Sequence, residues 1–327
     1  MNDPQMRTAV LEAFERLGSE LNPPFASREE YLADCLDIQR DTVAGHLPAE
    51  RIRLWIDLLE DPLAAGYREA FAAADMDLFA AALRHSSALR HAKVRAGGAD
   101  HSQLYGLALL AAAVHDEARS DALLPAELGP AAHGHPFAVA VTNLIMAIRA
   151  GETERSEPLG RDIARAGPRR LTAADQALLS CLTAILERDA GEASRKLHAY
   201  ARSMSVRKTV GHTALHRVVS PDAHGLFALA VRALGNDAVT PPETGAFSID
   251  FARWQLRAAP AGAFVVYTEQ LDEVGELLAT VPPRTRLRTE SSIGSRLLDA
   301  EAFRRDLIAR VLSRGSSATD VGEIVPT

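Results

Sequence analysis

Cysteine is scarce in this sequence, and the two cysteines lie far apart. Cys35 and Cys181 form no recurring spacing, so they make neither a disulfide framework nor a cysteine metal site. Each falls within an apolar stretch with helical spacing, where cysteine behaves as a small hydrophobic side chain. We therefore expect two buried free thiols with no redox role.

Long apolar runs are also missing. The sequence has no stretch of about 18 consecutive apolar residues, the length that a transmembrane helix needs. Residues 1–16 lack the basic start and apolar run of a secretory signal. We expect a cytoplasmic protein that has no membrane contact.

Lysine is almost absent, and the acidic residues are unevenly distributed. The chain has 36 Lys and Arg against 43 Asp and Glu, for a net charge of -7. Residues 1–90 hold 16 acidic and 9 basic residues, which accounts for the whole excess. Nucleic-acid binding needs a basic face, so this distribution predicts no nucleic-acid partner. It favours steering toward a basic partner, although acidic helices that only aid solubility give the same pattern.

Motifs that carry catalysis are missing as well. The sequence has no nucleophile elbow, no glycine-rich phosphate loop and no paired-carboxylate motif. His212 and His216 are four residues apart, a spacing that metal sites use on a helix, and His224 is the nearest third ligand. No glutamate follows His212, so the metalloprotease pattern is incomplete. We interpret the pair as ordinary histidines and expect no metal and no cofactor.

Three other polar positions have both a functional and a structural interpretation. His133 and His135 flank a glycine in a loop, where a helix that begins at the next residue, Pro136, explains the local chemistry. His115 is either a buried base beside two acids or a histidine in the last turn of a helix over residues 104–118. Asp75 is either a buried functional acid or the N-cap of a new helix. We favour the structural interpretation of each.

Helix signals recur along most of the chain. Ser27 and Glu30 form a capping box, and Thr172 and Ser220 precede further apolar stretches. Apolar residues repeat at spacings of three and four, as in the stripe Ile52, Trp55, Ile56 and Leu59. We predict an all-α fold, an irregular compact array of antiparallel helix pairs without a fixed-period repeat.

The pattern weakens toward the C-terminus. We divide the chain into a helical domain of residues 1–260 and an extension of mixed strand and helix over residues 261–314. The tail, residues 315–327, is rich in Ser and Gly, so we expect it to be disordered. The one short run that prefers a strand is Phe264-Val265-Val266-Tyr267.

Three helical stretches carry a resemblance to a known family. They lie within residues 50–260 and comprise Tyr67 to Ala82, Leu178 to Asp189 followed by Leu197 and Tyr200, and Gly225 to Gly235 followed by Phe247-Ser248-Ile249-Asp250. Together they resemble the immunity protein 49 family of bacterial polymorphic toxin systems. The resemblance implies an all-helical protein that binds a cognate toxin, often a nuclease or nucleic-acid deaminase, and blocks it. It transfers no functional residues, since the family has no shared catalytic motif.

The function expected from this resemblance is that of an immunity protein and not of an enzyme. One alternative is a helical scaffold or adaptor in regulation. Another is a helical hydrolase or metal enzyme that uses His115 or the pair His212 and His216. The resemblance does not identify the toxin.

The acidic first part of the chain is the expected partner-binding surface. The stripe that contains Trp55 must face the core, because an exposed tryptophan among large aliphatic side chains would form a costly patch. Carboxylates off this stripe then point toward solvent, where they can speed association with a basic toxin. We expect the contacts to draw on Glu50, Asp57, Glu60 and Asp61.

Overall fold

Helices account for most of the protein, as the recurring caps and apolar stripes predict. The computed structural model describes residues 3–21, 25–95, 99–152, 171–207, 213–257, 260–290 and 295–319, and 69% of the protein is helical. This confirms the all-α class. The longer helices are α1 (Asp3–Leu21), α2 (Arg28–Ile38), α3 (Pro48–Leu58), α4 (Leu63–Ala73), α5 (Met76–Ala92), α6 (Tyr105–Ala113), α8 (Pro136–Ala150), α10 (Ala173–Leu186), α11 (Ala190–Ser205), α12 (Pro221–Leu234) and α15 (Ala300–Thr319). The shorter ones are α7 (Glu117–Leu123), α13 (Ile249–Leu256), α14 (Asp272–Ala279) and the π-helical turn η1 (Gln39–Val43).

Side chains at the helix starts satisfy backbone N–H groups that have no partner within the helix. Ser27 accepts from the N–H of Glu30, and the Glu30 carboxylate accepts from the N–H of Ala26. Asp75 accepts from the N–H of Leu78, which confirms it as the N-cap of α5. The preceding residue, Ala74, has φ of +55° and separates α4 from α5.

The predicted helix over residues 104–118 is wrong, because the chain breaks at Val114. α6 ends at Ala113, and α7 begins at Glu117. His115 adopts the left-handed conformation, with φ of +53°, so it lies beyond the last turn rather than in it. The carboxylate of Asp116 then accepts from the N–H of Arg119 and starts α7. The N-cap at Asp116 therefore starts a new helix, although the apolar spacing of this stretch predicts a single continuous one.

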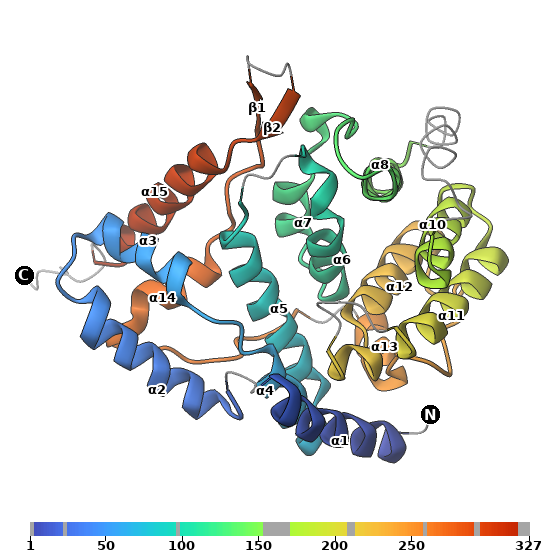
Figure 1. Ribbon diagram of the computed structural model, residues 1–327, viewed down its shortest axis with the longest axis horizontal. Coiled ribbons are helices and arrows are strands. Elements are labelled where there is room, and N and C mark those ends of the chain that lie inside the picture. The colour runs from blue at the N-terminus through green and yellow to red at the C-terminus, as the bar shows by residue number, and fades with distance from the viewer. Residues whose placement is uncertain are drawn as a thin grey trace, which may run out of the picture.

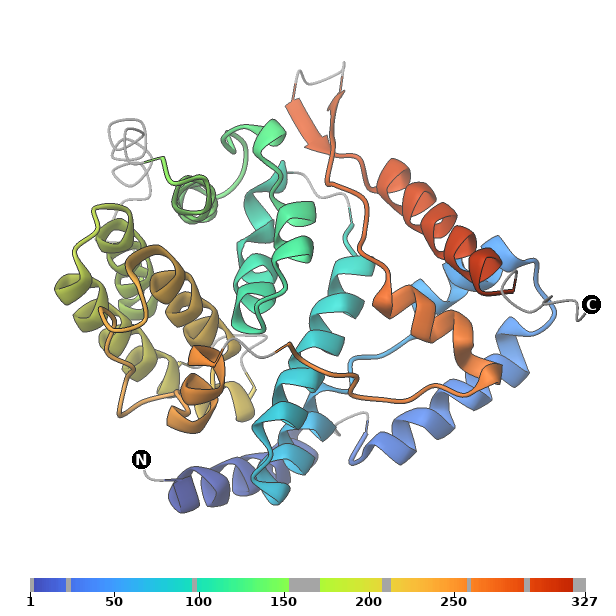
Figure 2. The ribbon, with the colours of Figure 1, turned by 180° about the vertical axis from the view of Figure 1, so that it is seen from behind.

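The helices form three groups from one end of the molecule to the other (Figure 1). α10 to α13 lie at one end, α5 to α8 in the middle, and α2, α3, α14 and α15 at the other end, as the reverse view also shows (Figure 2). Consecutive helices α4 and α5 pack together, as do α10 and α11, while α12 packs on α6. One hydrophobic core runs through these groups and includes side chains from beyond residue 260, among them Phe264, Leu277 and Phe303.

The strand predicted at Phe264–Tyr267 is wrong. This segment forms no strand and bends at Phe264 and Val265, whose side chains are buried in the core. The sheet lies further on, where β1 (Leu287–Glu290) pairs antiparallel with β2 (Ser295–Leu298). A strand requires a neighbouring strand for its N–H and C=O groups, and β propensity alone does not supply one.

The C-terminal helix overlaps the predicted tail, residues 315–327. α15 continues through Thr319, so residues 315–319 are helical. The remaining residues of the predicted tail, 320–327, lie outside the described residues.

The close packing of α12 on α6 yields a testable prediction. A Cβ atom added at Gly225 would lie 2.6 Å from the carbonyl carbon of Leu109 on α6. Because backbone cannot move aside as a side chain can, Gly225→Ala should lower the free energy of unfolding by about 3 kcal/mol. Urea denaturation monitored by circular dichroism would measure the loss.

Gly106→Ala is the matched control for this prediction. Gly106 lies on α6 itself, and a Cβ there would meet nothing within 4 Å. Alanine favours a helix over glycine, so this variant should be as stable as the parent or slightly more so. Equal stability of the two variants would show that α12 does not approach α6 closely.

Candidate functional site

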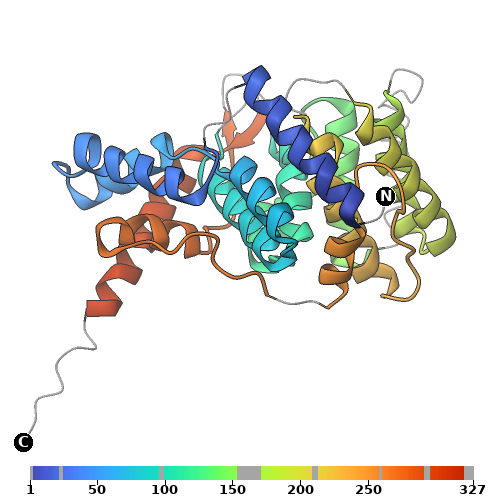
Figure 3. The same ribbon diagram turned by 90° about the horizontal axis from the view of Figure 1, so that it is seen from below.

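The junction of α2 and α3 carries exposed carboxylates and an exposed leucine. Figure 3 shows α2 and α3 projecting at one end of the molecule, far from α10 and α11. Asp37, Asp41 and Glu50 have side chains that are 61%, 61% and 60% exposed, and Leu47 between them is 70% exposed. We call these four residues the acidic corner.

Local structure fixes the acidic corner in place. α2 passes directly into the π-helical turn η1, and Pro48 occupies the first turn of α3. The carboxylate of Glu50 accepts a hydrogen bond from the N–H of Leu47 at 3.3 Å and lies 3.5 Å from Nδ1 of His46. Glu50 therefore holds the start of α3 while remaining exposed.

Two of the nearby arginines turn away from the acidic corner. Arg28 pairs with Glu69 of α4 at 2.5 Å, and Arg51 pairs with Glu273 of α14 through bonds of 3.0 and 3.1 Å. Arg40 remains at the corner, 66% exposed, where it contacts both Asp37 and Asp41. Engagement of Arg28 and Arg51 elsewhere leaves the exposed face of these helices predominantly acidic.

The four acids predicted from the sequence fall into different environments. The apolar stripe of α3 is buried as predicted, with Trp55 1% exposed. Glu50 and Glu60 are exposed. Asp57 is 39% exposed and lies 3.5 Å from Arg304 of α15, so it also joins α3 to the C-terminal helix. Asp57 and Glu60 lie toward the other end of α3, away from the acidic corner.

Asp61 is engaged inside the fold rather than presented to solvent. Its carboxylate accepts hydrogen bonds from the Ser86 hydroxyl and the Arg90 guanidinium, each at 2.7 Å, and from the N–H of Leu63 at 3.1 Å. Burial alone would raise the pKa of Asp61, but Arg90 and Ser86 outweigh it, and the pKa falls below its ordinary value. Asp61 thus connects the start of α4 to α5.

The acidic corner contains residues that the sequence did not single out. Asp37, Asp41 and Leu47 were not among the predicted contacts, although their sequence neighbourhood offered a signal. Leu47 precedes Pro48 and falls outside the apolar stripe of α3. Because helical spacing places only the stripe in the core, a large aliphatic residue outside the stripe and next to a turn is expected to be exposed.

The histidines considered for chemistry are held by structural contacts. Nε2 of His115 lies 2.9 Å from the carbonyl oxygen of Gln255, and its ring stacks on Trp254. Burial lowers the pKa of His115. His216 lies near the ring of Tyr67, at 6.3 Å between centroids, while His212 lies outside the described residues.

The third proposed metal ligand, His224, belongs to a buried hydrogen-bond network. Its Nδ1 pairs with Oε1 of Gln255 at 2.9 Å, and its Nε2 accepts from the N–H of Ser248 at 3.1 Å. Burial lowers its pKa to about 3, so the ring is neutral. His224 therefore has both nitrogens occupied by protein groups.

The loop histidines and the cysteines also have structural positions. His133 is 44% exposed, 3.8 Å from the buried Asp100, and His135 precedes Pro136 at the start of α8. Cys35 and Cys181 are buried free thiols, as predicted, and burial raises the pKa of Cys35 to about 12. Among the described residues, no group of three His, Cys, Asp or Glu side chains is arranged to hold a metal ion.

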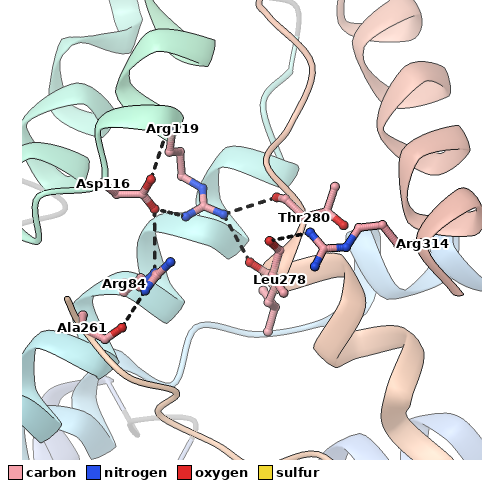
Figure 4. A network of polar contacts seen from close by, with 8 residues as sticks. Arg84, Asp116, Arg119, Ala261, Leu278, Thr280 and Arg314 are labelled. Atoms are coloured by element: carbon pink, nitrogen blue, oxygen red, sulfur yellow. Dashed lines mark hydrogen bonds and ion pairs between the residues drawn. The ribbon is translucent and has the colours of Figure 1, made fainter. Parts of the chain in front are cut away.

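A buried arginine network joins the middle of the molecule to the C-terminal segment (Figure 4). Arg119, 4% exposed, contacts the carboxylate of Asp116 and donates to the carbonyl oxygen of Leu278 at 3.2 Å. Arg84 donates to the carbonyl oxygen of Ala261 at 2.6 Å. Burial lowers the pKa of Arg119, with Asp116 acting in the opposite direction. The network thus fixes the segment 261–280 against α5 and α7.

Comparison with known proteins does not assign the chain to a family. The chain matches no family model, no curated protein and no solved structure. Within the described ranges, no helix is both long and apolar enough to cross a membrane.

The contacts of Asp61 predict a selective loss of stability. Asp61→Asn should lower the free energy of unfolding at pH 7 by about 1–2 kcal/mol. This is the usual contribution of a hydrogen bond to a charged group, reduced because Arg90 is partly exposed. The folded pKa of Asp61 is lowered, so its contribution is full above the unfolded pKa of about 4 and fades as the pH falls through the folded pKa. Urea denaturation across this pH range would measure the effect.

Glu60→Gln serves as the control for Asp61→Asn, because it removes an adjacent but exposed charge. Its effect on stability should stay within about 0.5 kcal/mol. If Asp61→Asn is equally silent, or if its cost persists unchanged at low pH, the network around Asp61 does not stabilise the fold as described.

Proposed function

We propose that this chain is an immunity protein that binds a basic toxin through the acidic corner and occludes it. The observation that carries the proposal is that three exposed carboxylates and an exposed leucine lie at the α2–α3 junction, at a projecting end of the molecule. The resemblance of residues 50–260 to the immunity protein 49 family supports the same function. The proposal requires no catalytic residue in this chain.

The acidic corner combines one exposed apolar side chain with charged neighbours, and each kind can serve a protein interface. An apolar side chain that fills a pocket on the partner supplies affinity, and a polar rim around it excludes water. Leu47 suits the first role, and Asp37, Asp41 and Glu50 suit the second. A toxin that grips nucleic acid carries a basic cleft, which these carboxylates complement. Such charges mainly accelerate association and fix its orientation.

The proposal makes a prediction about association kinetics. Replacing Asp37→Lys, Asp41→Lys and Leu47→Ser together should slow association with the toxin at least tenfold at low salt and weaken its dependence on ionic strength. The partner to use is the product of the adjacent reading frame. Growth rescue on co-expression tests neutralisation, and stopped-flow kinetics at several salt concentrations measure the association rate.

The control is Glu12→Lys with Glu15→Lys on α1, two exposed acids on another face. These two substitutions change the net charge by the same amount as the two aspartate substitutions. They therefore show whether the position of the charge matters or only the total charge. Equal slowing in both variants, or in neither, would reject the acidic corner. A chain that binds the partner without rescuing growth would instead be a scaffold or adaptor, and one that does neither would refute the immunity function.

A further inference from the structure

A cavity of about 600 Å³ lies between α5, α14 and the extended segment 261–267. Its walls carry small residues on all three elements, where a packed interior would carry large ones. α5 contributes Ala81 and Ala88, α14 contributes Gly275 and Ala279, and the extended segment contributes Ala261, Gly262 and Ala263. The space exists because small side chains coincide on segments that are far apart in the sequence.

The walls of the cavity are held by the arginine network of Figure 4. Arg84 fixes the extended segment through the carbonyl oxygen of Ala261, and Arg119 fixes the end of α14 through those of Leu278 and Thr280. The buried guanidinium of Arg119 resists collapse of these elements toward one another. The cavity is therefore part of the folded architecture.

His85 lines the cavity and supplies its buried polar group. The residue is 7% exposed, and its Nε2 lies 3.2 Å from the hydroxyl of Tyr31. Nδ1 of His85 has no hydrogen-bond partner among the described residues. This atom keeps some exposed surface. Because His85 lines the cavity, we infer that Nδ1 faces it.

The hydroxyls of Tyr31 and Tyr267 both lie beside Nε2 of His85. Tyr267 lies 3.5 Å from Nε2 and donates to the hydroxyl of Tyr31 at 3.4 Å, and we assign Tyr31 as the donor to Nε2. Burial lowers the pKa of His85 to about 4, and the ring is neutral at pH 7. A neutral ring that accepts at Nε2 carries its proton on Nδ1. The cavity therefore receives one N–H donor.

The charged residues of the lining are Arg84, Asp272 and Glu276, and Asp272 accepts from the N–H of Glu273 at 2.7 Å. The five N–H donors of Arg84 exceed the contacts it makes with Ala261 and Asp116. The carboxylate of Glu276 is already paired with Arg314 at 3.1 Å. Val266, also in the lining, is 82% exposed and offers apolar surface at the opening.

We propose that this cavity binds a small molecule with an apolar body and a carbonyl oxygen, which accepts from Nδ1 of His85. A volume of this size, apolar walls and few convergent polar groups are the features of small-molecule sites. A carboxylate and a neutral amide both have the carbonyl-type oxygen that can accept from Nδ1 of His85. The positive charge of Arg84 favours the carboxylate. The proposal does not rest on the immunity function, and its test requires no toxin.

Titration of the full chain with octanamide, octanoate and octylamine tests the proposal by isothermal calorimetry. The three probes share one apolar chain and differ in the head group. Octanamide and octanoate should bind at least tenfold more tightly than octylamine, which has no acceptor oxygen. Equal binding of all three, or binding of none at millimolar concentration, would overturn the assignment.

Graded filling of the cavity locates the binding. A Cβ at position 275 would lie 3.5 Å from the ring of Tyr267, an ordinary contact, so Gly275→Ala should retain octanamide binding within about threefold. Gly275→Leu extends further into the space and should weaken binding at least tenfold. Ala88→Leu fills the cavity from the opposite helix and should do the same. Binding that survives in folded forms of both leucine variants would refute the site. If neither variant folds, the preference among the three probes decides.

Discussion

The buried guanidinium of Arg119 is the contact on which the placement of the C-terminal segment depends. Its hydrogen bonds go to the carbonyl oxygens of Leu278 and Thr280, which lie at the C-terminal end of α14 and have no partner within that helix. Asp116 neutralises the charge that burial would otherwise make costly. Loss of the Arg119 side chain would leave the two carbonyl groups without these bonds and the buried Asp116 carboxylate without its closest cation.

Other features of this end of the molecule follow from the position of α14. Arg51 of α3 pairs with Glu273 of α14, and Asp57 of α3 pairs with Arg304 of α15. These contacts orient α3, whose start carries Glu50 of the acidic corner. Asp57 looks like a free surface carboxylate in the sequence. In the structure it pairs with Arg304 of α15, a helix more than 200 residues away in the chain.

The sequence predicted the features that depend on local chemistry. The cap at Ser27, the cap at Asp75 and the buried face around Trp55 need only neighbours within one or two helical turns. It failed where the outcome depends on distant partners. Phe264–Tyr267 has strand propensity but no strand beside it, and Asp61 meets Arg90 only after α4 and α5 pack. The cavity beside His85 could not be predicted either, since it needs small residues of α5 and α14 to meet.

The acidic corner and the cavity share α2, and this has a thermodynamic consequence for both proposals. Tyr31 of α2 is fully buried and bonds His85 at the cavity, while the C-terminal end of the same helix leads to Asp37 and Asp41. A ligand that requires the Tyr31–His85 bond binds only when α2 is docked, so by linkage it stabilises that docking. The same equilibrium governs the orientation of the acidic corner. Occupancy of the cavity and affinity at the corner are therefore coupled to the extent that α2 undocks in the free protein.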